Sequence, residues 1–360
     1  SSRFGKNNRY GSFPSASVGW RMSEESWMKK QKVFSDLKWR ISYGVTGNFQ
    51  IPNYSSYSLM GIANYVYGTT VANGLYPNTA GNPNIGWEKT KQWNWGADMA
   101  FLKNLLTFTA DYYISTTNGL LLNVPIPAAS GFTSALRNYG KLRTRGFEAS
   151  ARADITFGKL SWQPSVNFTT SRTKVLALGP NQTQILNRAS LTKVGGQVGT
   201  YYVYNVIGVY KSQEDLDKYP HLSTSKIGSY IYEDVDGDKK ITDADRVEKG
   251  NYNPDFTMGF NNTFKYKNVD FGFTAQWVYG SKIFNGQNVF LLNGEGWGNS
   301  SKKLFDHWWS ADQPTGYYAT PRSKPTDKLY ENSTLMVEDG SFLRFTNITL
   351  GYNLAKQWPR

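Results

Sequence analysis

The sequence predicts an all-β protein, part of a large antiparallel transmembrane β-barrel with long loops at one end. Three observations predict this fold class. Apolar and polar residues alternate over much of the 360-residue chain, as in strands with one apolar and one polar face. Short turns alternate with long connections, as periplasmic turns alternate with extracellular loops in outer-membrane barrels. Aromatic residues make up 16% of the chain, in keeping with the aromatic girdles of such barrels.

Composition narrows the functional classes. No run of 18 apolar residues occurs, so no transmembrane helix is predicted. The absence of cysteine excludes disulfides and thiolate chemistry. The net charge is +13, but the basic residues are dispersed and form no nucleic-acid-binding motif, so we expect no nucleic-acid partner. The two histidines, His221 and His307, fall in predicted loops, and no catalytic motif is present. We therefore expect no enzymatic activity and no redox cofactor.

The alternation predicts nine membrane-spanning strands. In the second of them, Leu37, Trp39 and Ile41 share the apolar face, and the intervening residues are polar. At about ten residues or more, each strand is long enough to cross a bilayer when tilted. The nine predicted strands are residues 11–22, 37–48, 88–101, 105–117, 142–156, 160–172, 254–266, 269–281 and 342–354. Because bacterial outer-membrane barrels have an even number of strands, we expect this chain to be part of a larger barrel.

The connections between these strands differ in length. Short turns are expected at 103–104, 157–159 and 266–268, and irregular loops rich in Gly, Asn and Pro at 49–86, 119–137, 172–252 and 282–340. Residues 200–210 have the pattern of a strand, but a spanning strand there would break the alternation of short and long connections. We therefore place them inside one large extracellular loop, residues 172–252.

Charged residues are expected on the polar face of the barrel strands. Because the interior of a large barrel is polar, we expect these side chains to line it. They are Lys38, Arg40, Asp98, Asp111, Glu148, Arg152, Asp154 and Asp270.

The acidic segment 234–245 has the spacing of an EF-hand calcium loop. Its side-chain ligands at positions 1, 3, 5 and 12 would be Asp234, Asp236, Asp238 and Asp245, with the Lys240 carbonyl at position 7 and Asp243 as a further acceptor. Two departures are Lys239 in place of the usual glycine at position 6 and Asp in place of Glu at position 12. A left-handed Lys239 would cost about 1 kcal/mol. The sequence predicts a structural Ca²⁺ (or Mg²⁺) site here, and the alternative is a solvated acidic turn.

Aromatic residues in the last long loop are candidates for contact with a ligand. Flat rings suit the apolar faces of sugars, and Trp297, Tyr317 and Tyr318 are predicted to face the ligand. The alternative is that they pack the loop or contact a partner protein. For Trp308 and Trp309 we expect packing.

Several segments, in order along the chain, resemble the SusC-like TonB-dependent outer-membrane transporters (the SusC/RagA family). They include "LKWRISYGVTGN" (37–48), "NPNIGWEKTKQWNWGADMAF" (82–101), "NYGKLRTRGFEASARADI" (138–155), "DVDGDKKITDADR" (234–246) and "EDGSFLRFTNITLGYNL" (338–354). The resemblance covers much of residues 1–360 and implies the C-terminal portion of a barrel of about 22 strands. On this interpretation the signal peptide, TonB box, plug and first half of the barrel lie outside this chain.

The resemblance also implies a function and partners. It implies TonB-dependent import of a nutrient, a glycan, oligosaccharide or peptide, across the outer membrane of a Gram-negative bacterium. A SusD-like lipoprotein would be the surface partner, TonB–ExbB–ExbD would supply energy, and lipid and lipopolysaccharide would surround the barrel. Two alternatives remain: a barrel with a structural or secretion-associated role and no import, and a soluble β-sandwich adhesin stabilised by calcium.

Overall fold

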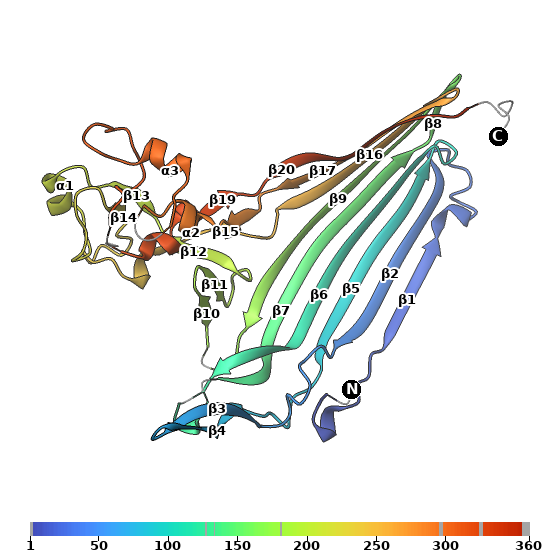
Figure 1. The fold of residues 1–360 in the computed structure, drawn as a ribbon. Helices are drawn as coiled ribbons and strands as arrows, with labels where there is room; N and C mark the ends of the chain where they lie inside the picture. Colours follow the sequence, from blue (N-terminus) through green and yellow to red (C-terminus); the bar gives the residue numbers. More distant parts are fainter. Residues whose placement is uncertain are drawn as a thin grey trace.

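The structure is a computed structural model that describes residues 3–126, 128–132, 134–180, 182–294, 298–323 and 327–354. One sheet of long strands forms most of it, and two connections between these strands form a separate cluster of small elements beside one end of the sheet (Figure 1). Among the described residues, no helix is long and apolar enough to cross a membrane.

The long strands follow one another in the sheet in chain order, each antiparallel to the next. They are β1 (Ser15–Arg21), β2 (Phe34–Asn48), β5 (Glu88–Phe101), β6 (Leu106–Pro125), β7 (Ser134–Ala153), β9 (Leu160–Ala177), β16 (Phe256–Tyr266), β17 (Val269–Tyr279) and β20 (Phe342–Tyr352). A short strand, β8 (Ile155–Phe157), follows β7 and also pairs with β9. These nine long strands correspond one for one to the nine predicted strands.

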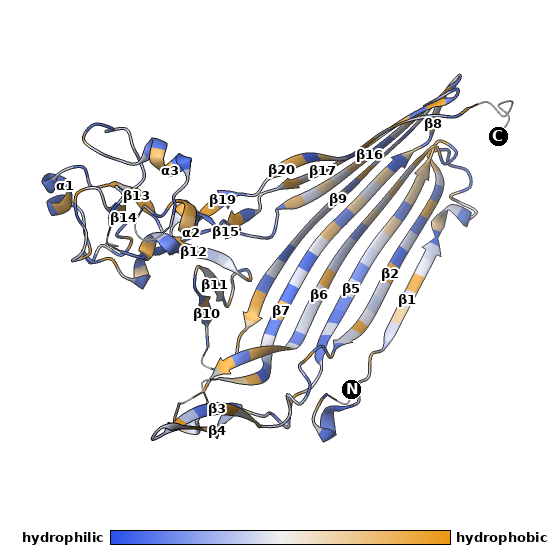
Figure 2. Cartoon of the chain, viewed as in Figure 1, coloured by the Kyte–Doolittle hydropathy of each residue, from blue (hydrophilic) through white to orange (hydrophobic). Residues whose placement is uncertain are grey.

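The register places apolar residues of neighbouring strands together on one face. Ile41 of β2 lies opposite Val18 of β1 and Trp95 of β5, and Trp95 lies opposite Tyr112 of β6. The large side chains on this face are exposed, with Val18 at 73% and Ile41 at 48%. Figure 2 shows the resulting mixture of apolar and polar bands along the strands. We call this surface the apolar face and the opposite surface the polar face.

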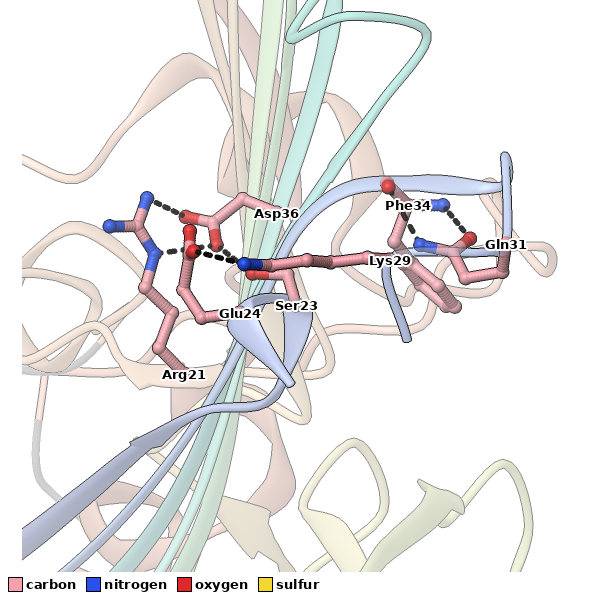
Figure 3. Close-up of polar contacts among 7 residues, drawn as sticks. All are labelled: Arg21, Ser23, Glu24, Lys29, Gln31, Phe34 and Asp36. Atoms are coloured by element: carbon pink, nitrogen blue, oxygen red, sulfur yellow. Dashed lines mark hydrogen bonds and ion pairs between the residues drawn. The ribbon is translucent and has the colours of Figure 1, made fainter. Parts of the chain in front are cut away.

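The connections at one end of the sheet are short: residues 22–33, 102–105, 158–159 and 267–268. The first of them contains the single turn η2 (Met22–Glu24) and is fixed by side chains (Figure 3). Arg21 Nε lies 2.9 Å from Asp36 Oδ1, and Ser23 Oγ donates to the same oxygen at 2.7 Å. The Gln31 amide accepts from Phe34 N at 2.8 Å and donates to Phe34 O at 2.9 Å. These polar contacts close the connection, and Met28 within it is buried, at 9% exposure.

The long connections contain more regular structure than the sequence predicts. Residues 59–79 form a hairpin of β3 (Leu59–Tyr67) and β4 (Thr70–Thr79), whose turn includes Gly68 at φ +60°. β6 extends to Pro125 and β7 begins at Ser134, so most of the loop predicted at 119–137 is strand. The prediction of irregular structure in these segments was wrong because long cross-strand pairing continues beyond the region of clear alternation.

Residues 178–252 and 282–341 together form what we call the loop lobe. Its strands are β10 (Gln184–Asn187), β11 (Ser190–Lys193), β12 (Thr200–Tyr204), β13 (Val206–Val209), β14 (Tyr230–Tyr232), β15 (Arg246–Asn251), β18 (Lys282–Phe284) and β19 (Val337–Asp339). Its helices are α1 (Gln213–Lys218), α2 (Asn288–Leu291) and α3 (Lys302–His307), with single turns η4 (Asp243–Asp245), η5 (Leu329–Asn332) and η6 (Thr334–Met336). Within residues 200–210, β12 and β13 are strands of this lobe and not of the long sheet, as predicted.

One hydrophobic core joins the two loops of the lobe. Tyr204 and Tyr232 from the first loop pack with Tyr330 and Met336 from the second, and all are at most 7% exposed. The backbone N–H of Val206 also donates to Thr334 Oγ1 at 3.1 Å, across 128 residues of sequence. The two loops therefore form a single folded unit, which the sequence did not predict.

Candidate functional site

A charge cluster occupies the polar face of the long sheet. Arg40 on β2 lies opposite Gly96 on β5, which lies opposite Asp111 on β6. Arg40 Nη2 reaches across the glycine to Asp111 Oδ2 at 3.0 Å, and its Nε lies 2.8 Å from Asp98 Oδ2. A Cβ on Gly96 would lie 2.5 Å from Asp111 Oδ1 and 2.6 Å from Arg40 Cζ. Because Gly96 has no side chain, it leaves the room that Arg40 needs to reach its second carboxylate, Asp111.

The other charged residues predicted for the barrel interior lie on the same face, except Asp154, which lies between the end of β7 and the start of β8. Glu148 of β7 lies opposite Asp111, which adds a carboxylate beside the Arg40 cluster. Arg152 and Asp154 form an exposed pair at 3.2 Å. Lys38 lies opposite Asp98, and Asp270 lies opposite Gly351 of β20. The polar face therefore carries both signs of charge along its length, as expected for a surface in contact with water.

Three carboxylates of the acidic loop converge. Asp234, Asp236 and Asp245 each place an oxygen within 4.8 Å of the others. Asp245 is fully buried and accepts from Val235 N at 2.8 Å and Thr242 N at 2.7 Å. Three carboxylates at this separation are the hard oxygen donors that Ca²⁺ prefers. The residues present therefore fit a bound divalent cation.

The other predicted ligands are arranged differently. Asp238 accepts from Lys240 N at 2.7 Å and lies outside the converging group. Asp243 turns toward β12, where it accepts from the Tyr204 hydroxyl and lies 2.7 Å from Arg246 Nη2. The hydrogen bond from Tyr204 holds the pKa of Asp243 below its usual range, and Arg246 adds to this effect. Lys239 adopts φ 65°, so it does take the left-handed conformation that the missing glycine would favour.

The structure separates the aromatic candidates. Tyr317 is 48% exposed, whereas Tyr318 is 3% exposed and packs with Leu292 and Leu304 in a small core. Burial raises the pKa of Tyr318. Tyr318 therefore differs from the prediction, because its ring is enclosed by the lobe and is not presented to a ligand.

The remaining tryptophans of this loop follow their predictions only in part. Trp308 packs against the core that contains Tyr318, and Trp309 packs against the core shared by the two loops. Both therefore pack the lobe, as expected. Trp297 lies outside the described residues, so its contact with a ligand stays a prediction.

Sequence reasoning missed a half-buried acidic group, Asp327, in the lobe. Tyr232 donates its hydroxyl to Asp327 Oδ1 at 2.8 Å, and Leu329 N donates to the same oxygen at 3.0 Å. Burial raises the pKa of Asp327, and these hydrogen bonds only partly offset the shift. Tyr232 and Asp327 come from different loops, so no local sequence pattern could have predicted their contact.

The chain is similar to known proteins over nearly its whole length. A family model described as "TonB dependent receptor-like, beta-barrel" matches residues 1–359. The chain belongs to this family of β-barrel receptors. Its apolar face is therefore the lipid-facing surface and its polar face lines the barrel interior. The family is one of transporters and receptors, and membership excludes the soluble adhesin that the sequence left open.

Several TonB-dependent receptors are similar to this chain over nearly its whole length. TonB-dependent receptor P3 of Formosa agariphila is 33% identical over 99% of this chain, and TonB-dependent receptor SusC of Bacteroides thetaiotaomicron is 31% identical over 99% of it. The solved structure of the RagAB peptide transporter matches 98% of the chain with a TM-score of 0.81 and 27% identity. The chain spans 36% of the length of these curated relatives and 38% of the matched RagAB chain.

Proposed function

We propose that the full-length protein imports a nutrient, an oligosaccharide or a peptide, across the outer membrane in a TonB-dependent manner together with a SusD-like lipoprotein. The observation that carries this proposal is a structural match at a TM-score of 0.81 to a protein described as a peptide transporter. The match covers nearly the whole chain, both the long sheet, which forms the barrel wall, and the loop lobe. The relative named SusC supports the same class of import. TonB–ExbB–ExbD would act on other parts of the full-length protein.

Each part of the chain would have a role in this function. The polar face, with the Arg40 cluster at its centre, would form part of the wetted wall along which a polar solute moves. The loop lobe would contribute to the rim of the barrel, where it would contact the lipoprotein and the arriving solute. Tyr317 and His307, with ring centroids 5.4 Å apart, form an exposed aromatic pair on this lobe.

Growth of a deletion strain tests import. The strain would be supplied with individual oligosaccharides and peptides as the sole nutrient and complemented with the wild-type gene or with a variant lacking the TonB box. We expect at least one substrate that supports growth only with the wild-type gene. Normal growth on every substrate, combined with a defect in the envelope or in secretion, would favour a structural or secretion-associated barrel instead.

A substitution of the exposed tyrosine tests the contribution of the lobe. Tyr317→Ala should reduce uptake of the identified substrate, because the ring is exposed and available to a solute or to the lipoprotein. Phe305→Ala is the matched control, since Phe305 on α3 is 72% exposed and belongs to the same loop. Equal uptake by both variants would remove Tyr317 from the binding surface.

The acidic loop would hold a structural Ca²⁺ (or Mg²⁺) through Asp234, Asp236 and Asp245. When bound, the cation would cross-link residues 234–236 to η4 and so stabilise this edge of the lobe. The support is the convergence of three carboxylates, one of them fully buried. An affinity of about 10⁻⁴ to 10⁻³ M would match extracellular calcium modules.

Calorimetry on the intact protein tests the metal. Asp236→Asn, which removes a converging carboxylate, should weaken Ca²⁺ binding by about tenfold, equivalent to about 1.4 kcal/mol. Asp243→Asn is the control, because Asp243 turns away toward Tyr204 and Arg246. No heat of binding at millimolar Ca²⁺ would show that the segment is a solvated acidic turn.

A further inference from the structure

The lipid-facing surface carries a group of cations close to the loop end of the sheet. In the register, the outward positions of β5, β7 and β9 continue from the apolar face into charged residues. These residues are Lys89, Lys91, Lys141, Arg143, Arg145, Arg172 and Lys174. All are exposed except Arg143, which is half-buried. No acidic residue occupies an outward position of the long strands in the described part of the chain.

Four of these cations form a compact block across one strand pair. Arg145 lies directly opposite Arg172, and Arg143 lies directly opposite Lys174. Like charges directly opposite one another destabilise a sheet. Arg172 has one carboxylate partner, with Nη2 2.6 Å from Asp255 Oδ1, and no other described carboxylate forms an ion pair with the block. The block therefore keeps an excess of positive charge that a bound anion would neutralise.

The same four side chains line a hollow. Residues 195–197 of the loop lobe close one side of it, held to the end of β9 by a hydrogen bond from Val175 N to Gly196 O at 2.9 Å. Gly195, at φ +87°, leaves open space where a Cβ would lie. Arginines bind phosphate oxygens through two parallel N–H donors, which makes such a hollow suited to a phosphate group.

The position of the block identifies the source of the phosphate. Phe147 lies two residues from Arg145 on the same face and belongs to a row of rings, with centroids 6.3 Å from Phe147 to Phe168 and 5.7 Å from Phe168 to Phe256. Aromatic rows of this kind mark the boundary between lipid and water. The block lies just beyond this row, at the depth of lipid head groups, where long basic side chains extend from the apolar region to the interface.

The opposite end of the lipid-facing surface provides an internal comparison. A second aromatic row lies there, with Trp162 and Phe264 stacked at 5.9 Å and Phe264 and Phe271 at 6.2 Å. The outward positions around it, such as Leu37, Met99 and Leu350, are uncharged. The excess of cations therefore belongs to one leaflet. Because outer-membrane barrels carry their long loops on the outside, this leaflet is the outer one.

We propose that Arg143, Arg145, Arg172 and Lys174 form a binding site for the phosphorylated head group of an outer-leaflet glycolipid. The acyl chains would lie along the apolar face beside Phe147, and the phosphate would occupy the hollow between β7, β9 and residues 195–197. A lipid bound in this way would fix the depth of the loop end of the barrel in the membrane. The proposal does not depend on which nutrient the protein imports.

Mass spectrometry of the detergent-solubilised full-length protein tests the proposal. With wild-type protein, bisphosphorylated lipid A should be retained about tenfold more than its dephosphorylated form, as expected from the loss of one charge-assisted contact. The double variant Arg145→Gln with Arg172→Gln should lose this preference. The matched control, Lys38→Gln with Lys265→Gln, removes the same charge from the interior face and should retain the lipid.

The remaining arms distinguish other sources of the anion. Phosphatidylglycerol should be retained less than bisphosphorylated lipid A, and millimolar inorganic phosphate should not displace the glycolipid. Equal retention of phosphorylated and dephosphorylated lipid A by wild-type protein would overturn the proposal without any variant. Displacement by inorganic phosphate, or equal retention of phosphatidylglycerol, would overturn it in favour of a general anion site. Heat-modifiable mobility in gels shows that each variant is folded.

Discussion

The long sheet and the loop lobe use apolar side chains in opposite ways. Ile41 in the sheet and Ile207 in the lobe are almost equally exposed, at 48% and 51%, but one contacts lipid and the other contacts water. In the lobe, large side chains such as Tyr210 and Met336 are buried, whereas in the sheet Leu350 is 77% exposed. The energetic cost of exposing an apolar side chain therefore depends on whether lipid or water surrounds it, and the exposed fraction alone does not determine this cost.

The two regions also differ in what holds them together. The sheet is a succession of backbone ladders between strands that follow one another, and every spanning backbone group must find such a partner. The lobe has short strands and depends on side chains that meet in one core. Mutations that affect apolar packing should therefore act on the lobe, and mutations that place charge in lipid should act on the sheet.

The largest expected effect is the removal of Met336, which is fully buried in the shared core. Met336→Ala should destabilise the lobe by about 2–5 kcal/mol through lost transfer free energy and the cavity that remains. Hydrogen exchange in residues 200–210 should accelerate strongly, because these residues pack against the same core. Leu350→Ala, on the lipid-facing surface, is the control and should leave their exchange unchanged. Unchanged exchange in Met336→Ala would show that the two loops fold independently.

The second prediction compares two isoleucines of equal exposure. Ile41→Lys should destabilise the barrel by about 2–4 kcal/mol if Ile41 lies near the middle of the bilayer. Ile207→Lys should change stability by less than about 0.5 kcal/mol, because this side chain is already in water. Urea unfolding of the full-length protein in lipid bilayers measures both. Similar losses for the two variants would contradict the assignment of the apolar face to lipid.

A smaller effect is expected at two lysines with the same backbone conformation. Lys239 in the lobe has φ 65° and Lys267 in the β16–β17 turn has φ 54°. Replacement by glycine removes the left-handed strain but loosens the unfolded chain, for a net gain of at most about 1 kcal/mol. Amide exchange near each turn measures the gain. Calcium should increase the protection around residue 239 and have no effect around residue 267, and equal responses would argue against the metal.

The smallest expected effect is a pH dependence of the lobe. Burial raises the pKa of Asp327 above its unfolded value, so the folded lobe binds the proton more tightly than the unfolded chain. Its contribution to stability is therefore largest at low pH and declines as the pH rises from about 4 through the raised pKa. Asp327→Asn should flatten this decline in denaturant midpoints measured between pH 4 and 7. An identical slope in the variant would show that another group is responsible.

The secondary structure of the long sheet was predicted better from the sequence than that of the loop lobe, and the reason is physical. In a strand between lipid and water, apolar and polar side chains must alternate. The alternating apolar residues Leu37, Trp39 and Ile41 therefore indicate a strand from the sequence alone. The hairpin at 59–79 and the short strands of the lobe have no such requirement, and their stabilising contacts come from distant segments. Tyr204 and Tyr330 share one core, but neither has a neighbouring sequence that indicates it.

The candidate sites show the same division. The EF-hand spacing predicted the convergence of Asp234, Asp236 and Asp245, because a local loop determines it. It also assigned Asp243 to the metal, although Asp243 instead contacts Tyr204, which lies far away in the sequence. Tyr318 was predicted at the surface because sequence alone cannot distinguish an exposed tyrosine from one enclosed by Leu292 and Leu304.

The shared core of the lobe has a consequence for the order of assembly. β9 and β16 are neighbours in the sheet but are separated by residues 178–255, and β17 and β20 are separated by residues 280–341. Bringing the ends of a long flexible segment together has an entropic cost that grows with its length. When the lobe has already folded, both segments are compact and have fewer flexible residues between their ends, so the entropic cost is lower. The last strand pairings of the wall should therefore form faster once the lobe is complete, and a defect in the Met336 core should appear as slow insertion.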